Sequence, residues 1–153
     1  MMFEAFVLLL AAAPVTDGPP ARQPELASDN VIADGKRALV SFECNTNAVK
    51  FQLRWPLPFE GTSVDVGVGS GGEMDAAMGP SKTWTTLAQA DHQVITPPFP
   101  GAEIVSAAGD EKYLLFMVKA PGASETAQFA TAAVKALFDE AVERCNLTDN
   151  REP

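Results

Sequence analysis

Hydrophobic and polar residues alternate along several segments between residues 38 and 118. In residues 38–44, for example, Val40, Phe42 and Cys44 share one face of an extended chain. This period of two is the side-chain repeat of a β-strand with one buried face. Residues 113–118 are apolar on both faces, which indicates a strand at the centre of a sheet or between two layers. The predicted strands are residues 38–44, 49–55, 63–68, 82–87, 92–96 and 113–118.

The pattern changes to a helical period near the C-terminus. From Val134 to Cys145 the apolar residues form one stripe of an α-helix, with Phe138 at its middle, where we expect it to be buried against the sheet. A shorter helix is predicted within residues 100–110, ended by Gly109. Antiparallel strands followed by one packing helix predict an α+β fold. This is either an antiparallel β-sheet or a small β-sandwich with a packed C-terminal α-helix.

The two cysteines of the chain, Cys44 and Cys145, are predicted to face inward, one on a strand and one on the helix stripe. One alternative is a pair of unpaired buried thiols, as in many cytosolic cores. A count of two together with an export signal favours a disulfide. Closing a loop of about 100 residues would stabilise the fold by roughly 4.7 kcal/mol in the chain-entropy model.

The export signal is the apolar run from Phe6 to Ala13, which has the length of a signal-peptide core and is too short to span a bilayer. The alternative is an ordinary buried segment of the core. The predicted organisation is a signal peptide at 1–20, a Pro-rich polar linker at 21–36, one disulfide-stapled β-rich domain at 37–147 and a polar tail at 148–153. A periplasmic or secreted location follows from this organisation.

The charge of the chain limits its partners. The 153 residues hold 11 Lys and Arg against 20 Asp and Glu, so that the net charge is −9. An acidic surface repels phosphate backbones and anionic lipid heads. Nucleic acid and membrane surfaces are therefore disfavoured as partners, no integral membrane segment is expected in the mature chain, and a basic protein remains compatible.

Candidate chemistry is sparse. Gly67, Gly69 and Gly72 satisfy the G-x-G-x-x-G pattern, but a dinucleotide site also needs a helix directly after the glycines, and the following segment stops at Gly79. We expect a flexible hairpin loop there and no cofactor. His92 is the only histidine, no serine lies in a nucleophile elbow, and one His with two Cys cannot form a zinc shell. These residues predict a protein that is not an enzyme.

The order of motifs resembles the VasI-like periplasmic family associated with type VI secretion, over roughly residues 40–146. The matching points are Trp84 opening a strand, a helical turn before Tyr113–Val118, and Phe129 leading into a helix that ends in Cys145. The resemblance implies an exported accessory protein and no catalytic residues.

The predicted partner-binding segment is the Gly-rich loop of residues 67–80, which carries Glu73, Met74, Asp75 and Met78 outside the strand pattern. The first hypothesis is therefore a non-catalytic, exported accessory or binding protein associated with secretion. The alternative is an inhibitor of a basic secreted enzyme such as lysozyme, in which acidic loops meet a cationic cleft. In both, the partner is another protein.

Overall fold

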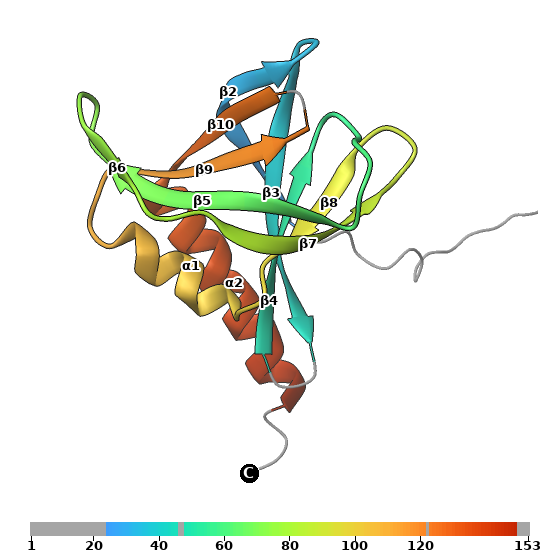
Figure 1. Ribbon diagram of the computed structural model, residues 1–153. Coiled ribbons are helices and arrows are strands. Elements are labelled where there is room, and N and C mark those ends of the chain that lie inside the picture. Colours follow the sequence, from blue (N-terminus) through green and yellow to red (C-terminus); the bar gives the residue numbers. More distant parts are fainter. Residues whose placement is uncertain (1–23, 46–47, 122, 150–153) are drawn as a thin grey trace, which may run out of the picture.

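The structure is a computed structural model that describes residues 24–45, 48–121 and 123–149. These ranges form a single antiparallel sheet and two helices (Figure 1). The strands are β2 (Leu26–Ala33), β3 (Lys36–Asn45), β4 (Ala48–Trp55), β5 (Ser63–Gly71), β6 (Ala76–Met78), β7 (Lys82–Ala88), β8 (Gln93–Thr96), β9 (Tyr113–Ala120) and β10 (Ala123–Ala130). The helices are α1 (Gly101–Ala108) and α2 (Thr131–Asp149).

The sheet curls until its two edge strands approach each other. The strand order is β10-β9-β5-β7-β8-β4-β3-β2, and β6 pairs with β5 beside this path. β2 and β10 contact each other, so the sheet is a nearly closed barrel. α2 packs on β3 and β4, while α1 packs on β4, β5 and α2, so both helices cover the same side of the barrel (Figure 1). This confirms the expected antiparallel β-sheet with a packed C-terminal helix.

Aromatic rings fill the space between the curled sheet and the helices. Phe51 and Phe116 stack with their centroids 5.3 Å apart, and Trp84 stands edge-on to both at 6.2 Å. Phe42 and Phe129 extend the cluster, and all five side chains are buried. Edge-to-face and offset pairs of this kind add about 0.5–1.5 kcal/mol each beyond the area that they bury.

Both helices follow the sequence pattern. Gly109 ends α1 with a φ of 58°, a value that favours glycine. On α2, Val134 and Ala141 are buried as predicted. Phe138 packs against the core as expected, but it is less buried than expected, because this side chain is only half-buried. Its ring packs edge-on against Phe42 at 5.2 Å, and part of it remains in contact with solvent.

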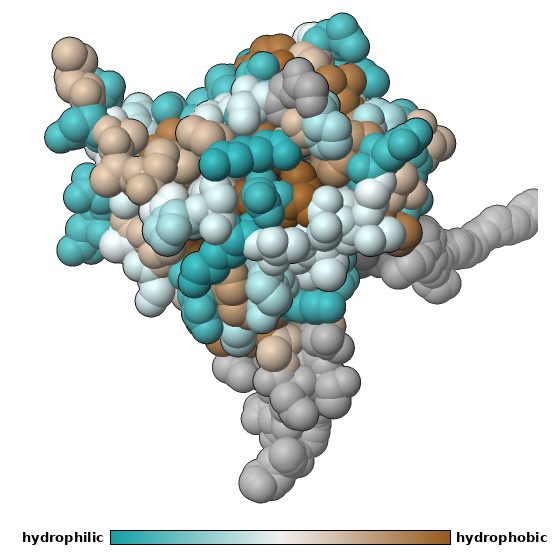
Figure 2. Space-filling view, in the orientation of Figure 1, coloured by the Kyte–Doolittle hydropathy of each residue, from teal (hydrophilic) through white to brown (hydrophobic). Residues whose placement is uncertain are grey.

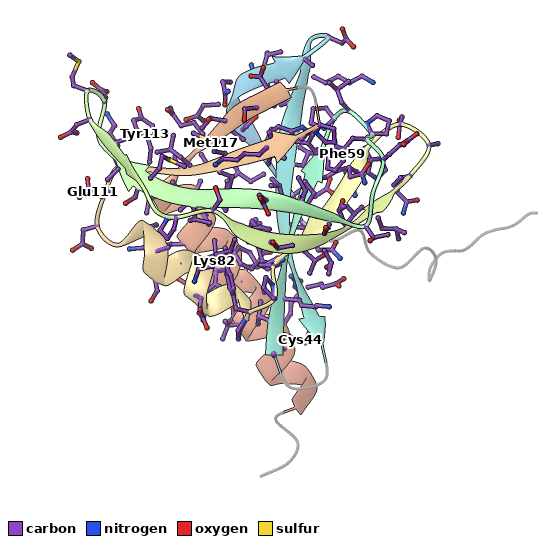
Figure 3. The ribbon with its side chains drawn as sticks, in the orientation of Figure 1. Cys44, Phe59, Lys82, Glu111, Tyr113 and Met117 are labelled. Carbon is purple, nitrogen blue, oxygen red and sulfur yellow. A yellow bond between two sulfur atoms is a disulfide. The ribbon has the colours of Figure 1, made fainter. Side chains whose placement is uncertain are left out.

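The disulfide between Cys44 and Cys145 is present, with the two Cα atoms 5.4 Å apart. It joins β3 to α2 across 101 residues of sequence, as predicted (Figure 3). The expected inward orientation holds for Cys145 and is wrong for Cys44, which is exposed. Cys44 lies near the end of β3, two residues beyond Phe42, where the packed core stops. The strand alternation continues there without a core to face.

The expected linker at 21–36 is wrong from residue 26 onward, because β2 occupies Leu26–Ala33 and pairs with β3. The two-residue turn between them, Asp34 and Gly35, has φ values of 52° and 74°. Positive φ at both positions is the geometry of a type I′ hairpin, for which Asp-Gly is a favoured pair. The folded domain therefore begins before residue 37. The predicted signal peptide and residues 150–153 of the tail lie outside the described residues.

The ends of α2 compare differently with the sequence prediction. Phe129 lies on β10, a strand that was not predicted, and leads into α2, which begins at Thr131 as expected. At its other end, α2 extends past Cys145, where the helix was expected to end, and through the expected domain boundary at 147 to Asp149. Neither helix in the described ranges is long and apolar enough to cross a membrane.

Candidate functional site: the β5–β6 hairpin

The segment expected as a flexible loop is a β-hairpin. β5 extends to Gly71, and β6 returns beside it with Gly69 opposite Met78 and Gly71 opposite Ala76. The backbone N–H of Gly72 donates to the carbonyl oxygen of Asp75 at 2.9 Å and closes the turn. The expected hairpin is therefore present, and the expectation of a flexible loop within residues 67–80 is wrong where β6 pairs with β5.

The glycines of this segment permit a close approach between the two strands. A Cβ at Gly69 would overlap the Met78 sulfur and the Ala77 carbonyl oxygen, and one at Gly71 would overlap the Asp75 carbonyl oxygen. Glycine in a strand commonly marks such an approach of a second backbone. Of the three glycines of the G-x-G-x-x-G pattern, only Gly69 has this steric requirement, and the chain continues from the pattern into a turn and a strand, not into a helix that could bind pyrophosphate.

The turn presents three exposed side chains, Glu73, Met74 and Asp75. Met74 is 93% exposed, and Met78, on β6, is 36% exposed. The hairpin projects from the body of the molecule (Figure 1), and its end is formed by a weakly hydrophobic surface beside hydrophilic groups (Figure 2). The four predicted partner-binding residues therefore lie on one projecting element.

An ion pair ties this element to the start of β9. The Lys112 ammonium donates to the Glu73 carboxylate at 2.6 Å. This hydrogen bond and the attraction between the two charges lower the pKa of Glu73 and raise the pKa of Lys112. Both groups are exposed, so water screens the pair and its effect is local positioning of the turn.

A depression of about 220 Å³ lies at the base of the turn, between the hairpin and the connection from α1 to β9. Asp75 and Glu111 contribute carboxylates to its wall, and the rest of the lining consists of small residues of β5 and β6. Glu111 points outward on this side of the molecule (Figure 3). The depression is suited to a cationic side chain. In the described ranges, no group of three or more His, Cys, Asp or Glu side chains could hold a metal ion.

His92 lies elsewhere, in the connection between β7 and β8. Its Nδ1 is 2.8 Å from an Asp91 carboxylate oxygen, and this hydrogen bond lowers the pKa of Asp91. The two residues line a second pocket, of about 460 Å³, together with Lys36, Arg37 and Arg54. A carboxylate partner of this kind orients an imidazole. The residues that line the pocket include no Ser, Thr or Cys to act as a nucleophile.

No protein-family model, curated protein or solved structure matches this chain. The candidate site therefore rests on its own geometry. Sequence reasoning placed the turn residues outside the strand pattern but did not single out Glu111 or Lys112. Lys112 and Glu73 are 39 residues apart in the sequence, and no local sequence pattern indicates that they are in contact.

Proposed function

We propose that this protein is an exported, non-catalytic binding protein that engages a partner protein through the β5–β6 hairpin. The observation that carries the proposal is Met74, 93% exposed at the end of a projecting hairpin and flanked by Glu73 and Asp75. Burial of an exposed apolar side chain by a partner removes it from water and therefore favours binding. Its flexible thioether also adapts to pockets of irregular shape.

The geometry defines the chemistry of the partner surface. An apolar pocket that accepts Met74, bordered by Lys or Arg side chains, would complement the turn. The Glu73–Lys112 pair limits the freedom of the turn before binding, which lowers the entropic cost of association.

Two observations support an exported accessory role. The disulfide between Cys44 and Cys145 fits an oxidising compartment. The elements on which the resemblance to the VasI-like family rests occur in the expected order, with Trp84 in β7, α1 before β9, and Cys145 on α2. Association with a type VI secretion system remains a proposal based on that resemblance.

A second candidate function is inhibition of a basic secreted enzyme such as lysozyme. The acidic depression beside the hairpin favours it, because Asp75 and Glu111 would receive a cationic side chain of the enzyme while the turn enters its cleft. In this case the attraction should weaken as salt screens the charges.

The proposal is tested by capture from a periplasmic extract on immobilised, oxidised protein. We expect Met74→Ser to lose the captured partner, since exposed anchors of this kind carry a large share of binding energy. Leu87→Ser is the matched control, because Leu87 is an exposed apolar residue of β7, 63% exposed, outside the hairpin. Equal capture by both variants would show that the hairpin is not the contact surface.

The second candidate is tested by lysozyme inhibition at low and high salt. We expect the unmodified protein to inhibit lysozyme at low salt. The double variant Asp75→Asn with Glu111→Gln should no longer inhibit it. Absence of inhibition by the unmodified protein removes this candidate and leaves the first. A hydrolase activity that disappears in His92→Ala would contradict the non-catalytic proposal itself.

A further inference from the structure

A separate apolar pocket of about 220 Å³ lies between α1 and the strands β5 and β7. Val66, Trp84 and Ile104 contribute walls that are almost wholly buried. Phe99 also lines the pocket and stands edge-on to Trp84, with the ring centroids 5.7 Å apart. The pocket therefore offers an apolar and partly aromatic surface to a group of limited size.

Two opposite charges border this apolar space. Lys82 lies at the start of β7 and Glu103 in the first turn of α1, and both are exposed residues that line the pocket (Figure 3 labels Lys82). Within the described residues, neither Lys82 nor Glu103 forms an ion pair with the other or with another side chain. An ammonium and a carboxylate are thus available at one pocket without neutralising each other.

The size and the charges together restrict the ligand. Pockets for drug-sized molecules usually begin at about 300 Å³, so this one suits a group the size of one amino-acid side chain. The side chain of leucine or phenylalanine would contact Val68 and Phe99, the half-buried apolar residues of the lining. A carboxylate at Lys82 and an ammonium at Glu103 would complete the match, and these are the two charges of a free amino acid.

We propose that this pocket binds a free, zwitterionic α-amino acid with an apolar side chain. The side chain enters between α1 and the sheet, the α-carboxylate pairs with Lys82, and the α-ammonium pairs with Glu103. The proposal does not depend on the hairpin function, because none of Glu73, Met74 and Asp75 lines this pocket. It assigns the protein a small-molecule ligand in addition to a protein partner.

Binding is measured by calorimetry on the oxidised full chain, with L-leucine and L-phenylalanine as the probes. We expect saturable binding of at least one of them, and none of glycine, which lacks the side chain. N-acetyl-L-phenylalanine lacks the ammonium and phenethylamine lacks the carboxylate. Each should bind about two- to fivefold more weakly than phenylalanine, since each lacks one of two contacts with exposed, solvent-screened charges.

Variants of the protein locate the site. Lys82→Gln and Glu103→Gln should each weaken binding by about two- to fivefold, because both charges are exposed and screened by water. Ala107→Trp should block it, because Ala107 is an exposed residue of α1 that lines the pocket. Lys119→Gln and Glu125→Gln are the controls, since both residues are exposed and neither lines it.

Three results would overturn the proposal. One is absence of binding by both amino acids at millimolar concentration. Another is binding that the Lys82, Glu103 and Ala107 variants leave unchanged. The third is equal affinity for N-acetyl-phenylalanine amide, which has neither α-charge. That result would assign the pocket to the side chain of a partner protein and not to a free amino acid.

Discussion

Asn30 on β2 accepts a hydrogen bond from the backbone N–H of Gln128 on β10, at 2.9 Å. The side-chain amide of Asn30 also donates to the carbonyl oxygen of Thr126 at 2.7 Å. The strand ladders of the described residues run through the sheet from β10 to β2 but do not pair these two edges with each other. The Asn30 side chain on β2 therefore bonds to the backbone of β10 at the place where backbone pairing of β2 with β10 would close the barrel.

Replacing Asn30 tests this closure. Asn30→Ala removes both hydrogen bonds, and we expect it to lower the free energy of unfolding by about 1 kcal/mol, the lower end for two bonds because the site is exposed. The measurement is urea unfolding followed by tryptophan fluorescence.

Asn30→Asp is the matched variant for this test. The carboxylate still accepts from Gln128 but cannot donate to the Thr126 carbonyl, so its stability should fall between those of the unmodified protein and Asn30→Ala. An Asn30→Ala protein with an unchanged unfolding midpoint would show that the two edges are held together by other contacts.

Sequence analysis found the strands that alternate or that are apolar on both faces, and it missed three strands: the two edges, β2 and β10, and the short β6 beside β5. In β2 the inward position at residue 28 is a serine, which is 2% exposed. Its hydroxyl donates to the Asn30 carbonyl oxygen at 2.6 Å and accepts from the Ala38 N–H at 3.1 Å. These bonds allow a polar side chain to be buried at a position where the strand pattern calls for an apolar one. The irregular register of β2 interrupts the alternation further. In residues 124–130 of β10, only Ala127 and Phe129 are buried in the core.

The exposure of the turn residues was predictable from the sequence, and the pairing of β6 with β5 was not. Glu73, Met74 and Asp75 fall outside the strand pattern, and they are exposed at a turn. A run rich in glycine indicated a loop, because glycine is disfavoured in strands. The pairing of β5 with β6 depends on the close approach at Gly69, which is a property of the folded backbone.

Phe138 provides a test of how α2 packs. Full burial would predict a loss of about 3–5 kcal/mol for Phe138→Ala, and half burial reduces this to about 2 kcal/mol. Glu143→Ala is the control on the exposed face of the helix, with an expected change below about 0.5 kcal/mol. Chemical denaturation of the oxidised proteins measures both. If the two variants are equally stable, the contact of Phe138 with Phe42 does not hold α2 on the sheet.

The glycines of the hairpin are not equivalent, and a pair of alanine substitutions separates them. Gly69→Ala forces the new Cβ against Met78 and the Ala77 backbone, so we expect β6 to leave β5 and the amide protons of residues 76–78 to exchange faster. Gly72→Ala should leave this exchange unchanged, because its Cβ would meet only the Asp75 side chain, at 3.6 Å. Slow exchange at residues 76–78 in Gly69→Ala would contradict the close approach of the two strands.

The Glu73–Lys112 pair predicts how the turn responds to pH. The folded protein lowers the pKa of Glu73, so the contribution of the pair is present above the ordinary Glu value of 4.5 and is lost as the pH falls through the lowered value. The pKa of Lys112 is raised, so the contribution is present below the ordinary Lys value of 10.5 and is lost as the pH rises through the raised value. Between these limits the turn is tied to β9.

Lys112→Gln should raise the pKa of Glu73 toward its ordinary value, as measured by carbon NMR titration of the side-chain carboxyl group. Lys119→Gln, which removes an exposed charge elsewhere on β9, should leave the Glu73 titration unchanged. Global stability should change little in either variant because both members of the pair are exposed. If Glu73 titrates identically with and without Lys112, the hairpin is not held to β9 by this contact, and the positioning of Met74 must arise from the β5–β6 pairing alone.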